Sequence, residues 1–290
     1  MFKGSIVAIV TPFKNGAVDE EKLRELVEFQ ISGGTDAIVP CGTTGESSTL
    51  DYEEHDRVIE IVIQQVGKRV PVIAGTGSNS TAETIELTRK AKELGADGCL
   101  LVTPYYNKPT QEGLYRHYTA IADAVDIPQI LYNVPGRTAV NLLPETVALL
   151  AEHSNIVAIK EATGSLQQAS EILALAGDKI DVFSGDDFIT FPMMTCGAKG
   201  VISVTANIMP AEIAALVDAF RVGDLEKARQ LHLRMLMINN AMFVESNPVP
   251  VKTALGLMGK CSDEVRLPLC PMSDANKGKL TAIMNEYQLI

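Results

Sequence analysis

The residue in this sequence that is best suited to do chemistry is Lys160. It follows the apolar, β-branched run at residues 156–159 and precedes Glu161. A lysine at the junction of a buried strand and a loop is partly desolvated, which favours the neutral, nucleophilic amine. A free lysine side chain has a pKa of about 10.4, so it needs such surroundings to act as a nucleophile near neutral pH. The alternative is a lysine that only caps a strand and extends to water.

Other apolar runs also end in side chains that could bind a substrate or move protons. These polar ends are residues 42–46 (Gly-Thr-Thr-Gly-Glu), 103–107 (Thr-Pro-Tyr-Tyr-Asn), 132–137 (Tyr-Asn-Val-Pro-Gly-Arg), 184–187 (Ser-Gly-Asp-Asp) and 203–207 (Ser-Val-Thr-Ala-Asn). With Lys160 they supply an amine nucleophile, phenols and hydroxyls for proton transfer, and backbone N–H groups for a carboxylate. This set is typical of imine chemistry.

Each of these motifs also has a structural explanation. Residues 42–45 could be only a strand-to-helix turn, and Arg137 could form a surface ion pair. Tyr105 and Tyr106 could pack in an interface between subunits. The motifs therefore indicate a site only if they lie together in space.

Two acidic motifs have similar explanations at the starts of helices. Ser80 and Glu83 have the spacing of a capping box, in which each side chain bonds the backbone of the other. Asp186 and Asp187 resemble a pair of catalytic carboxylates, but N-capping of the next helix explains them better.

The placement of histidine and cysteine argues against a metal site. The histidines are scattered and none ends a strand, so we expect each on a helix surface or at a helix end. They are His55, His117, His153 and His232. The five cysteines contain no Cys-x-x-Cys pair, so we expect buried thiols and neither a disulfide framework nor a zinc site.

Composition excludes several classes of function. A net charge of −11 without a basic cluster argues against a nucleic-acid surface. No segment has the pattern of a signal peptide or the length of a membrane span, which makes the cytoplasm the default location.

The elements that must position these residues form a repeating pattern. Apolar runs typical of strands occur at 5–10, 37–40, 70–74, 98–102, 129–133, 156–160, 181–184 and 201–204, and helical periodicity lies between most of them. Eight such units predict an α/β fold, a (β/α)8 TIM barrel, whose active site lies at the carboxyl ends of its strands. A doubly wound sheet is the alternative, but the first strand lacks the Gly-rich phosphate loop usual there.

The end of the chain is predicted to be helical. Helical stretches at 211–221, 225–243 and 250–258 follow the last strand, and no flexible linker separates them from it. We therefore expect a catalytic barrel over residues 1–223 and a C-terminal helical region, packed on the barrel, over residues 224–290.

The sequence resembles the dihydrodipicolinate synthase family over essentially its whole length. The resemblance rests on residues 4–12 (Gly-Ser-Ile-Val-Ala-Ile-Val-Thr-Pro), 42–47, 72–77, 102–107, 131–138, 159–164 and 203–207. Most of these motifs mark the wider family of pyruvate-dependent Schiff-base aldolases, which includes N-acetylneuraminate lyase. Arg137, just after Tyr-Asn-Val-Pro-Gly, marks the synthase branch.

The resemblance implies a lyase of lysine and diaminopimelate biosynthesis that needs no cofactor. Lys160 would form an imine with pyruvate, and the derived enamine would attack L-aspartate 4-semialdehyde. Tyr132 would move protons, linked through Thr43 to Tyr106 of a neighbouring subunit. The pyruvate carboxylate would be held by Thr44, with a main-chain contact from Ile202 and close backbone approach at Gly185. Arg137 would bind the carboxylate of the semialdehyde.

The resemblance also implies a homotetramer, a dimer of dimers, with feedback inhibition by L-lysine. The matching inhibitor positions are Ser48, His55, Asn79, Glu83 and Tyr105, where Glu83 would bind the ammonium group. Tyr52 stands where some inhibited members have histidine, and Ser48 stands where alanine is common. We therefore expect weaker or altered inhibition.

Two other functions stay open. A pyruvate-dependent aldolase or lyase acting on a sugar acid such as N-acetylneuraminate would share Lys160 and Tyr132 but leave Arg137 unexplained. A barrel that binds a phosphorylated cofactor for redox chemistry, or a ligand without catalysis, would leave Lys160 unexplained.

Overall fold

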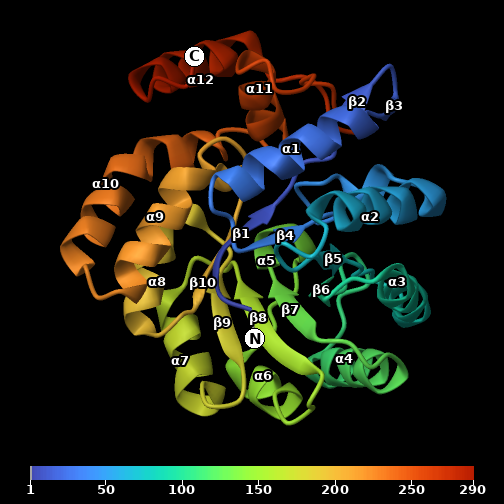
Figure 1. Ribbon diagram of the computed structural model, residues 1–290. Helices are drawn as coiled ribbons and strands as arrows, with labels where there is room; N and C mark the ends of the chain where they lie inside the picture. The colour runs from blue at the N-terminus through green and yellow to red at the C-terminus, as the bar shows by residue number, and fades with distance from the viewer. Residues whose placement is uncertain (1) are drawn as a thin grey trace.

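The centre of the molecule is a barrel of eight parallel strands (Figure 1). The computed structural model describes residues 2–290. In chain order the strands are β1 (Gly4–Ala8), β4 (Ala37–Val39), β5 (Ile73–Gly75), β6 (Gly98–Val102), β7 (Gln129–Asn133), β8 (Ile156–Glu161), β9 (Asp181–Ser184) and β10 (Gly200–Ser203). They are ordered β4-β1-β10-β9-β8-β7-β6-β5, and a parallel bridge from Ile38 to Val72 brings the two edge strands together. The predicted barrel is confirmed, and each strand overlaps its predicted range.

Helices surround the barrel on its outer face (Figure 1). They are α1 (Glu20–Ser32), α2 (Tyr52–Val66), α3 (Thr81–Leu94), α4 (Gln111–Ala124), α6 (Pro144–Leu150), α7 (Leu166–Ala176), α8 (Thr190–Cys196) and α9 (Pro210–Arg221). The short helix α5 (Pro135–Thr138) follows β7 and lies instead over the mouth of the barrel. Three short 3-10 helices, η1 (Ser47–Thr49), η2 (Asp187–Ile189) and η3 (Thr205–Asn207), follow β4, β9 and β10. Each lies at the carboxyl end of its strand, where the polar motifs were predicted.

Local capping chemistry explains where several helices start. The carboxylate of Asp51 accepts a hydrogen bond from the backbone of Glu54, as an N-cap should. Ser80 caps α3 by accepting from the backbone N–H of Glu83, but the Glu83 carboxylate bonds Ser78 and Tyr52 instead of returning to Ser80. The predicted capping box is therefore wrong in its second half, because Glu83 has partners outside the turn.

Two apolar clusters follow from strand alternation. Side chains on one face of the strands, such as Ile6, Ala158 and Ile202, fill the barrel interior. Those on the other face, such as Val7 and Ile159, pack against the surrounding helices. The inner cluster forms a floor beneath the carboxyl ends of the strands.

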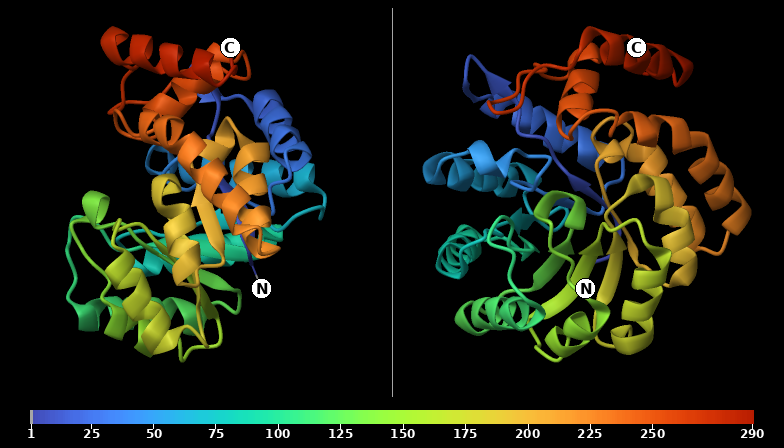
Figure 2. Two further views of the ribbon diagram at one scale, coloured as in Figure 1. Left: turned by 90° about the vertical axis from the view of Figure 1, so that its left-hand side faces the viewer. Right: turned by 180° about the vertical axis from the view of Figure 1, so that it is seen from behind.

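The C-terminal segment forms α10 (Leu225–Ala241), α11 (Val249–Leu257) and α12 (Asp274–Glu286) at one side of the barrel (Figure 2). Helix α10 packs against α8, α9 and α12. A small hairpin of β2 (Phe13–Lys14) and β3 (Ala17–Val18), absent from the sequence prediction, meets the segment after α11 through hydrogen bonds to Glu264. The division at residue 223 stays a prediction, since barrel helices and C-terminal helices share one apolar cluster.

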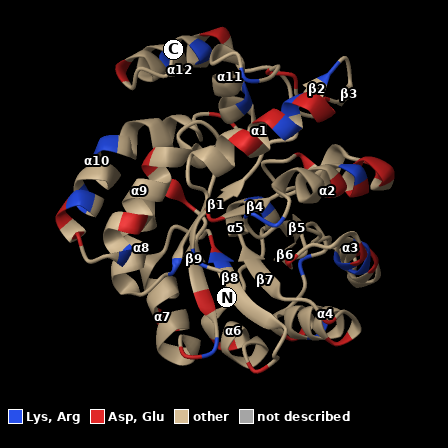
Figure 3. Ribbon diagram, viewed as in Figure 1, with Lys and Arg blue, Asp and Glu red and all other residues tan. Residues whose placement is uncertain are grey.

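Charged residues of both signs occur along outer helices such as α2 and α10, while most residues of the barrel strands are uncharged (Figure 3). Within residues 2–290 no helix is long and apolar enough to cross a bilayer. Likewise, no three His, Cys, Asp or Glu side chains in this range are grouped so that they could hold a metal ion.

Two expectations about individual side chains are wrong. His55, His117 and His232 are buried, because their rings find partners inside the fold: His117 bonds Thr81, for example. Among the cysteines, Cys196 and Cys270 are exposed, whereas the other three are buried as predicted.

Candidate active site

Lys160 lies on the inner face of β8. Ala158 belongs to the inner cluster and Ile159 to the outer one, so strand alternation turns the lysine inward. Its side chain stands at the carboxyl end of the strand, and the residue is only 4% exposed. The position is where catalytic groups of such barrels are found.

Tyr132 is the neighbour of Lys160 on β7. The two residues are register partners across the parallel pairing of β7 and β8. The ammonium nitrogen Nζ of Lys160 lies 4.4 Å from the centre of the Tyr132 ring. On the other side of β8, Phe183 of β9 is the register partner of Lys160. The amine therefore lies against the ring of Tyr132, which carries a phenol.

Lys160 and Tyr132 line a cavity of about 400 Å³ at the mouth of the barrel. Its walls contain the predicted residues Thr44, Arg137 and Gly185 beside Lys160 and Tyr132. Gly185 has a structural requirement of its own: a Cβ there would lie 2.5 Å from the Cβ of Ala162. The absence of a side chain lets β9 approach the end of β8 and leaves room above the lysine.

Sequence reasoning missed the part of this cavity that comes from the connection between α10 and α11. Phe243, Glu245, Ser246 and Asn247 line it. The Asn247 amide donates to Thr44 Oγ1 at 2.9 Å, and the Asn247 carbonyl accepts from Arg137 Nη2 at 3.2 Å. Asn247 therefore ties two predicted substrate residues together. The only signal in the sequence was the helix break at Asn-Pro, which does not say where the residue lies.

The acidic pair after β9 does not cap a helix, so that interpretation is wrong. Asp187 is buried, and its carboxylate accepts from the Ser203 hydroxyl and from the backbone of Val204 and Thr205, which joins the loops after β9 and β10. Asp186 lines the cavity with Lys160. Burial raises the pKa of Asp186 to about 6, although the charge of Lys160 acts in the opposite direction.

Ile202 is buried beneath the cavity in the inner cluster. It lies one residue beyond Val201, which pairs with Ser184 of β9. Its side chain belongs to the floor of the barrel, so only its main chain is placed for a contact with a ligand.

A second cavity of about 560 Å³ adjoins the first, and Val134 and Arg137 line both. It is formed by η1, α2, the start of α3 and the loop after β6. Four of the five predicted inhibitor residues line it: Ser48, His55, Glu83 and Tyr105. The fifth, Asn79, lies outside the lining and donates to the Tyr105 carbonyl at 3.2 Å. Thr43 also faces this second cavity.

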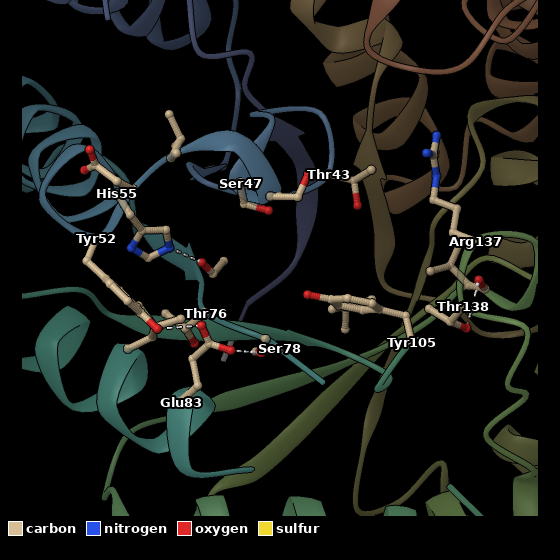
Figure 4. Close-up of a pocket in the computed structure, with 18 residues that line it drawn as sticks. Thr43, Ser47, Tyr52, His55, Thr76, Ser78, Glu83, Tyr105, Arg137 and Thr138 are labelled. Carbon is tan, nitrogen blue, oxygen red and sulfur yellow. Dashed lines mark hydrogen bonds between the residues drawn. The ribbon is translucent and has the colours of Figure 1, made fainter. Parts of the chain in front are cut away.

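Glu83 already has partners in this second cavity. Tyr52 donates its phenol hydrogen to Glu83 Oε1 at 2.6 Å, and the Ser78 hydroxyl bonds the other oxygen (Figure 4). These hydrogen bonds lower the pKa of Glu83. The carboxylate is therefore held ionised at the edge of the cavity, with part of its hydrogen-bonding capacity in use.

Tyr106 lies outside both cavities and points into solvent. It is 92% exposed, and its φ of 71° places it in the left-handed region at the centre of a tight turn, where the Asn107 N–H bonds the Tyr105 carbonyl. This turn is costly for a non-glycine residue. The structure therefore does not bring Tyr106 into contact with Thr43 or Tyr132 of its own chain.

Comparison with known proteins shows the family. Residues 1–287 match the model of the dihydrodipicolinate synthetase family. The 4-hydroxy-tetrahydrodipicolinate synthase of Geobacter sulfurreducens is 84% identical over 100% of both chains. The dihydrodipicolinate synthase of Acinetobacter baumannii, a chloride-inhibited enzyme solved with pyruvate, is 50% identical with a TM-score of 0.98 over 100% of both chains. The enzyme of Cyanidioschyzon merolae with lysine bound is 42% identical, with a TM-score of 0.96 over 100% of this chain and 99% of that one.

Proposed function

The chain belongs to the dihydrodipicolinate synthetase family, and on that premise we propose that it condenses pyruvate with L-aspartate 4-semialdehyde. The product is 4-hydroxy-tetrahydrodipicolinate, an intermediate of lysine and diaminopimelate biosynthesis. The observation that carries this proposal is the inward-facing Lys160, enclosed at the barrel mouth beside the Tyr132 phenol. A relative that is 84% identical bears the name of this activity.

The reaction proceeds through covalent attachment of pyruvate to Lys160. The amine adds to the ketone carbon and water leaves, which forms an imine. Loss of a methyl proton gives an enamine, whose carbon attacks the aldehyde of the second substrate and forms the new C–C bond. The amine of that substrate then adds to the imine carbon, closes the ring and displaces the Lys160 amine.

Tyr132 is the proton carrier of this scheme. Its ring lies against the lysine ammonium, so its hydroxyl can give a proton to the leaving water and later take one from the incoming amine. Thr43 and Tyr106 extend the relay toward a neighbouring subunit. The 92% exposure of Tyr106 on a costly turn supports this role, because a partner surface would cover the ring.

The two substrate carboxylates are held at different places. Thr44 holds that of pyruvate next to Lys160, helped by the main chain at Ile202 and by the space above Gly185. Arg137, at the junction of the two cavities, binds that of the semialdehyde with its planar fork. A sugar-acid substrate gives Arg137 no comparable task, which favours the synthase over the lyase reaction.

The second cavity is the proposed site of regulation by L-lysine. Glu83 binds the ammonium group there, with Ser48, His55, Asn79 and Tyr105 around the ligand. The lysine-bound relative supports such a site. Inhibition is weaker than in members without the phenol, because Tyr52 competes for Glu83. The assembly is a homotetramer of two dimers, in which Tyr106 crosses the dimer interface.

Borohydride trapping tests the central step. The protein is incubated with pyruvate and borohydride, which reduces an imine to a stable amine, and the adduct is located by peptide mass spectrometry. We expect one adduct, on Lys160, and none in Lys160→Ala. Lys108→Ala, on the exposed loop after β6, is the control that keeps the adduct. An unmodified Lys160 would exclude the mechanism, whereas an adduct without turnover of semialdehyde would point to the sugar-acid reaction.

A further inference from the structure

An ion pair lies completely inside the protein, away from the reacting lysine. Lys252 of α11 donates to Glu46 Oε1 at 2.6 Å, and the two side chains are 0% and 1% exposed. Elsewhere in residues 2–290 the ion pairs of lysine and arginine leave each side chain at least 18% exposed. Burial lowers the pKa of Lys252, while the Glu46 charge acts against that shift.

Such a pair is a poor way to gain stability. Removing two charges from water costs about as much as their attraction returns, and apolar residues of the same size are often as good or better. The pair is therefore better explained by the backbone that it holds in place. Glu46 ends the Gly-Thr-Thr-Gly-Glu loop and has a left-handed φ of 53°. Its N–H donates to the Thr43 carbonyl at 3.1 Å, so its position is coupled to that of Thr43.

The same C-terminal segment holds the loop at a second point. Asn247, five positions before Lys252, donates to the hydroxyl of Thr44. A third contact comes from Arg266, whose backbone N–H donates to Glu46 Oε2 at 3.1 Å. Both carboxylate oxygens of Glu46 are thus bonded to the chain that follows α10.

The ring of Phe13 contacts the cationic side chains of both Lys252 and Arg266, which with Glu46 form one cluster. Lys252 Nζ lies 4.1 Å and the Arg266 guanidinium 4.3 Å from the centre of the buried Phe13 ring. Arg266 also binds Glu54 through both of its terminal nitrogens. These contacts leave the cluster little freedom to move. Because Glu46 belongs to both the cluster and the loop of residues 42–46, they also restrict the movement of that loop.

We propose that Lys252 and Glu46 are positioning residues, which clamp residues 42–46 so that Thr44 meets the pyruvate carboxylate and Thr43 meets the proton relay. This inference rests on the proposed function, because it uses the roles given there to Thr43 and Thr44. It assigns to the C-terminal helices a part in binding the first substrate, although they carry none of the predicted catalytic residues.

Three variants separate positioning from simple stability: Lys252→Met, Glu46→Met and the double variant. Each single variant leaves one buried charge unpaired and lowers the Tm. The double variant removes both charges and therefore recovers most of the Tm that the single variants lose. We expect it to keep a pyruvate KM raised about tenfold, since small misplacements of binding groups are costly, while the semialdehyde KM changes less than about twofold.

The opposite pattern would overturn the inference. The pair would have no role in positioning if the double variant had both a wild-type pyruvate KM and a recovered Tm. The same conclusion would follow if the pyruvate and semialdehyde KM values rose equally. Val217→Ala in α9 is the control for lost stability, because it empties core volume in a helix that lines neither cavity and should leave both KM values unchanged.

Two further measurements keep the test decisive. Glu46→Gln preserves the shape of the side chain and one acceptor for the Arg266 backbone N–H, so it can be used if a Met variant does not fold. We expect it to raise the pyruvate KM about threefold. An unchanged pyruvate KM in Glu46→Gln would also overturn the inference.

Borohydride trapping on wild type and on each variant distinguishes failure of the proposed function from failure of the clamp. A missing Lys160 adduct in wild-type protein refutes the proposed function, whereas adducts in all variants with unchanged KM refute only the clamp.

Discussion

Lys160 and Tyr132 are register partners on adjacent parallel strands, and 4.4 Å separates the lysine ammonium nitrogen from the centre of the tyrosine ring. Both side chains arise from the inner face of the barrel, so neither needs a loop to bring it to the other. The distance is set by the strand pairing itself. In the proposed mechanism, a nucleophile and a proton carrier on adjacent strands need little reorganisation before they react.

Removing the Tyr132 hydroxyl should slow the proton transfers without abolishing pyruvate binding. In Tyr132→Phe we expect kcat to fall about 10²- to 10³-fold, the usual size of a general acid–base contribution. The pyruvate KM should change less than about threefold, because the ring that packs on Lys160 is retained. Steady-state kinetics measure both values, and a kcat within about threefold of wild type would remove Tyr132 from the relay.

Arg137→Ala should affect the second substrate more than the first. The loss of a charge-assisted contact raises the semialdehyde KM by about 30-fold or more, while the pyruvate KM stays within about threefold. Arg116→Ala, an exposed arginine of α4 paired with Glu112, is the matched control and should change neither value. Equal increases in both KM values would show that Arg137 has another role.

Tyr106 can be tested by mixing two defective subunits. Tyr106→Phe removes the phenol, and Lys160→Ala removes the nucleophile. If Tyr106 enters the partner's site, a mixed dimer contains one site with a native lysine and a native phenol, so co-expression of the two chains should restore activity. If Tyr106 acts within its own chain, the mixture should be no more active than the separate variants. Exchange between differently tagged chains confirms that mixed dimers form.

Tyr52→Phe should strengthen inhibition by L-lysine. The phenol of Tyr52 donates to Glu83 at 2.6 Å, and its removal leaves that carboxylate free to bind an ammonium group. We expect the Kd for L-lysine, measured by isothermal titration, to fall about fivefold, or roughly 1 kcal/mol, the net value of one such hydrogen bond. Tyr115→Phe in α4 is the control. Weaker binding in Tyr52→Phe would mean that the phenol itself contacts the inhibitor.

Asp186 should make stability depend on pH. Its pKa is raised to about 6 in the folded protein, against about 3.9 in an unfolded chain. The folded state binds this proton more tightly than the unfolded chain does. Below pH 4 the Asp186 carboxyl therefore adds its full contribution of about 3 kcal/mol to the free energy of unfolding, and this contribution is lost as the pH rises through 6.

Asp186→Asn removes this titration. Relative to wild type, the variant should therefore become more stable as the pH rises from 4 to 8, as measured by thermal unfolding at each pH. Asp126→Asn, on the exposed connection before β7, is the matched control. A difference between Asp186→Asn and wild type that stays constant with pH would mean that burial does not raise the pKa of Asp186.

The sequence alone determined the barrel and the place of Lys160. Strand alternation and the position of polar residues at strand ends are local patterns, and they act within a few residues of chain. For this reason the eight strands and the place of Lys160 at the end of one of them could be predicted from residues that are close together in the sequence. The register pairing of Lys160 with Tyr132 joins two strands 28 positions apart, and Tyr132 was expected near the lysine only through the family resemblance.

Tertiary structure decided what holds those residues in place. Asn247 reaches Thr44 across 203 positions and Lys252 reaches Glu46 across 206, and no periodicity connects such distant residues. The acidic pair after β9 looked like a helix cap, yet Asp187 joins two loops because packing brings Ser203 to it. A local pattern specifies which way a side chain faces on its own element. Its partner depends on which other elements fold against it.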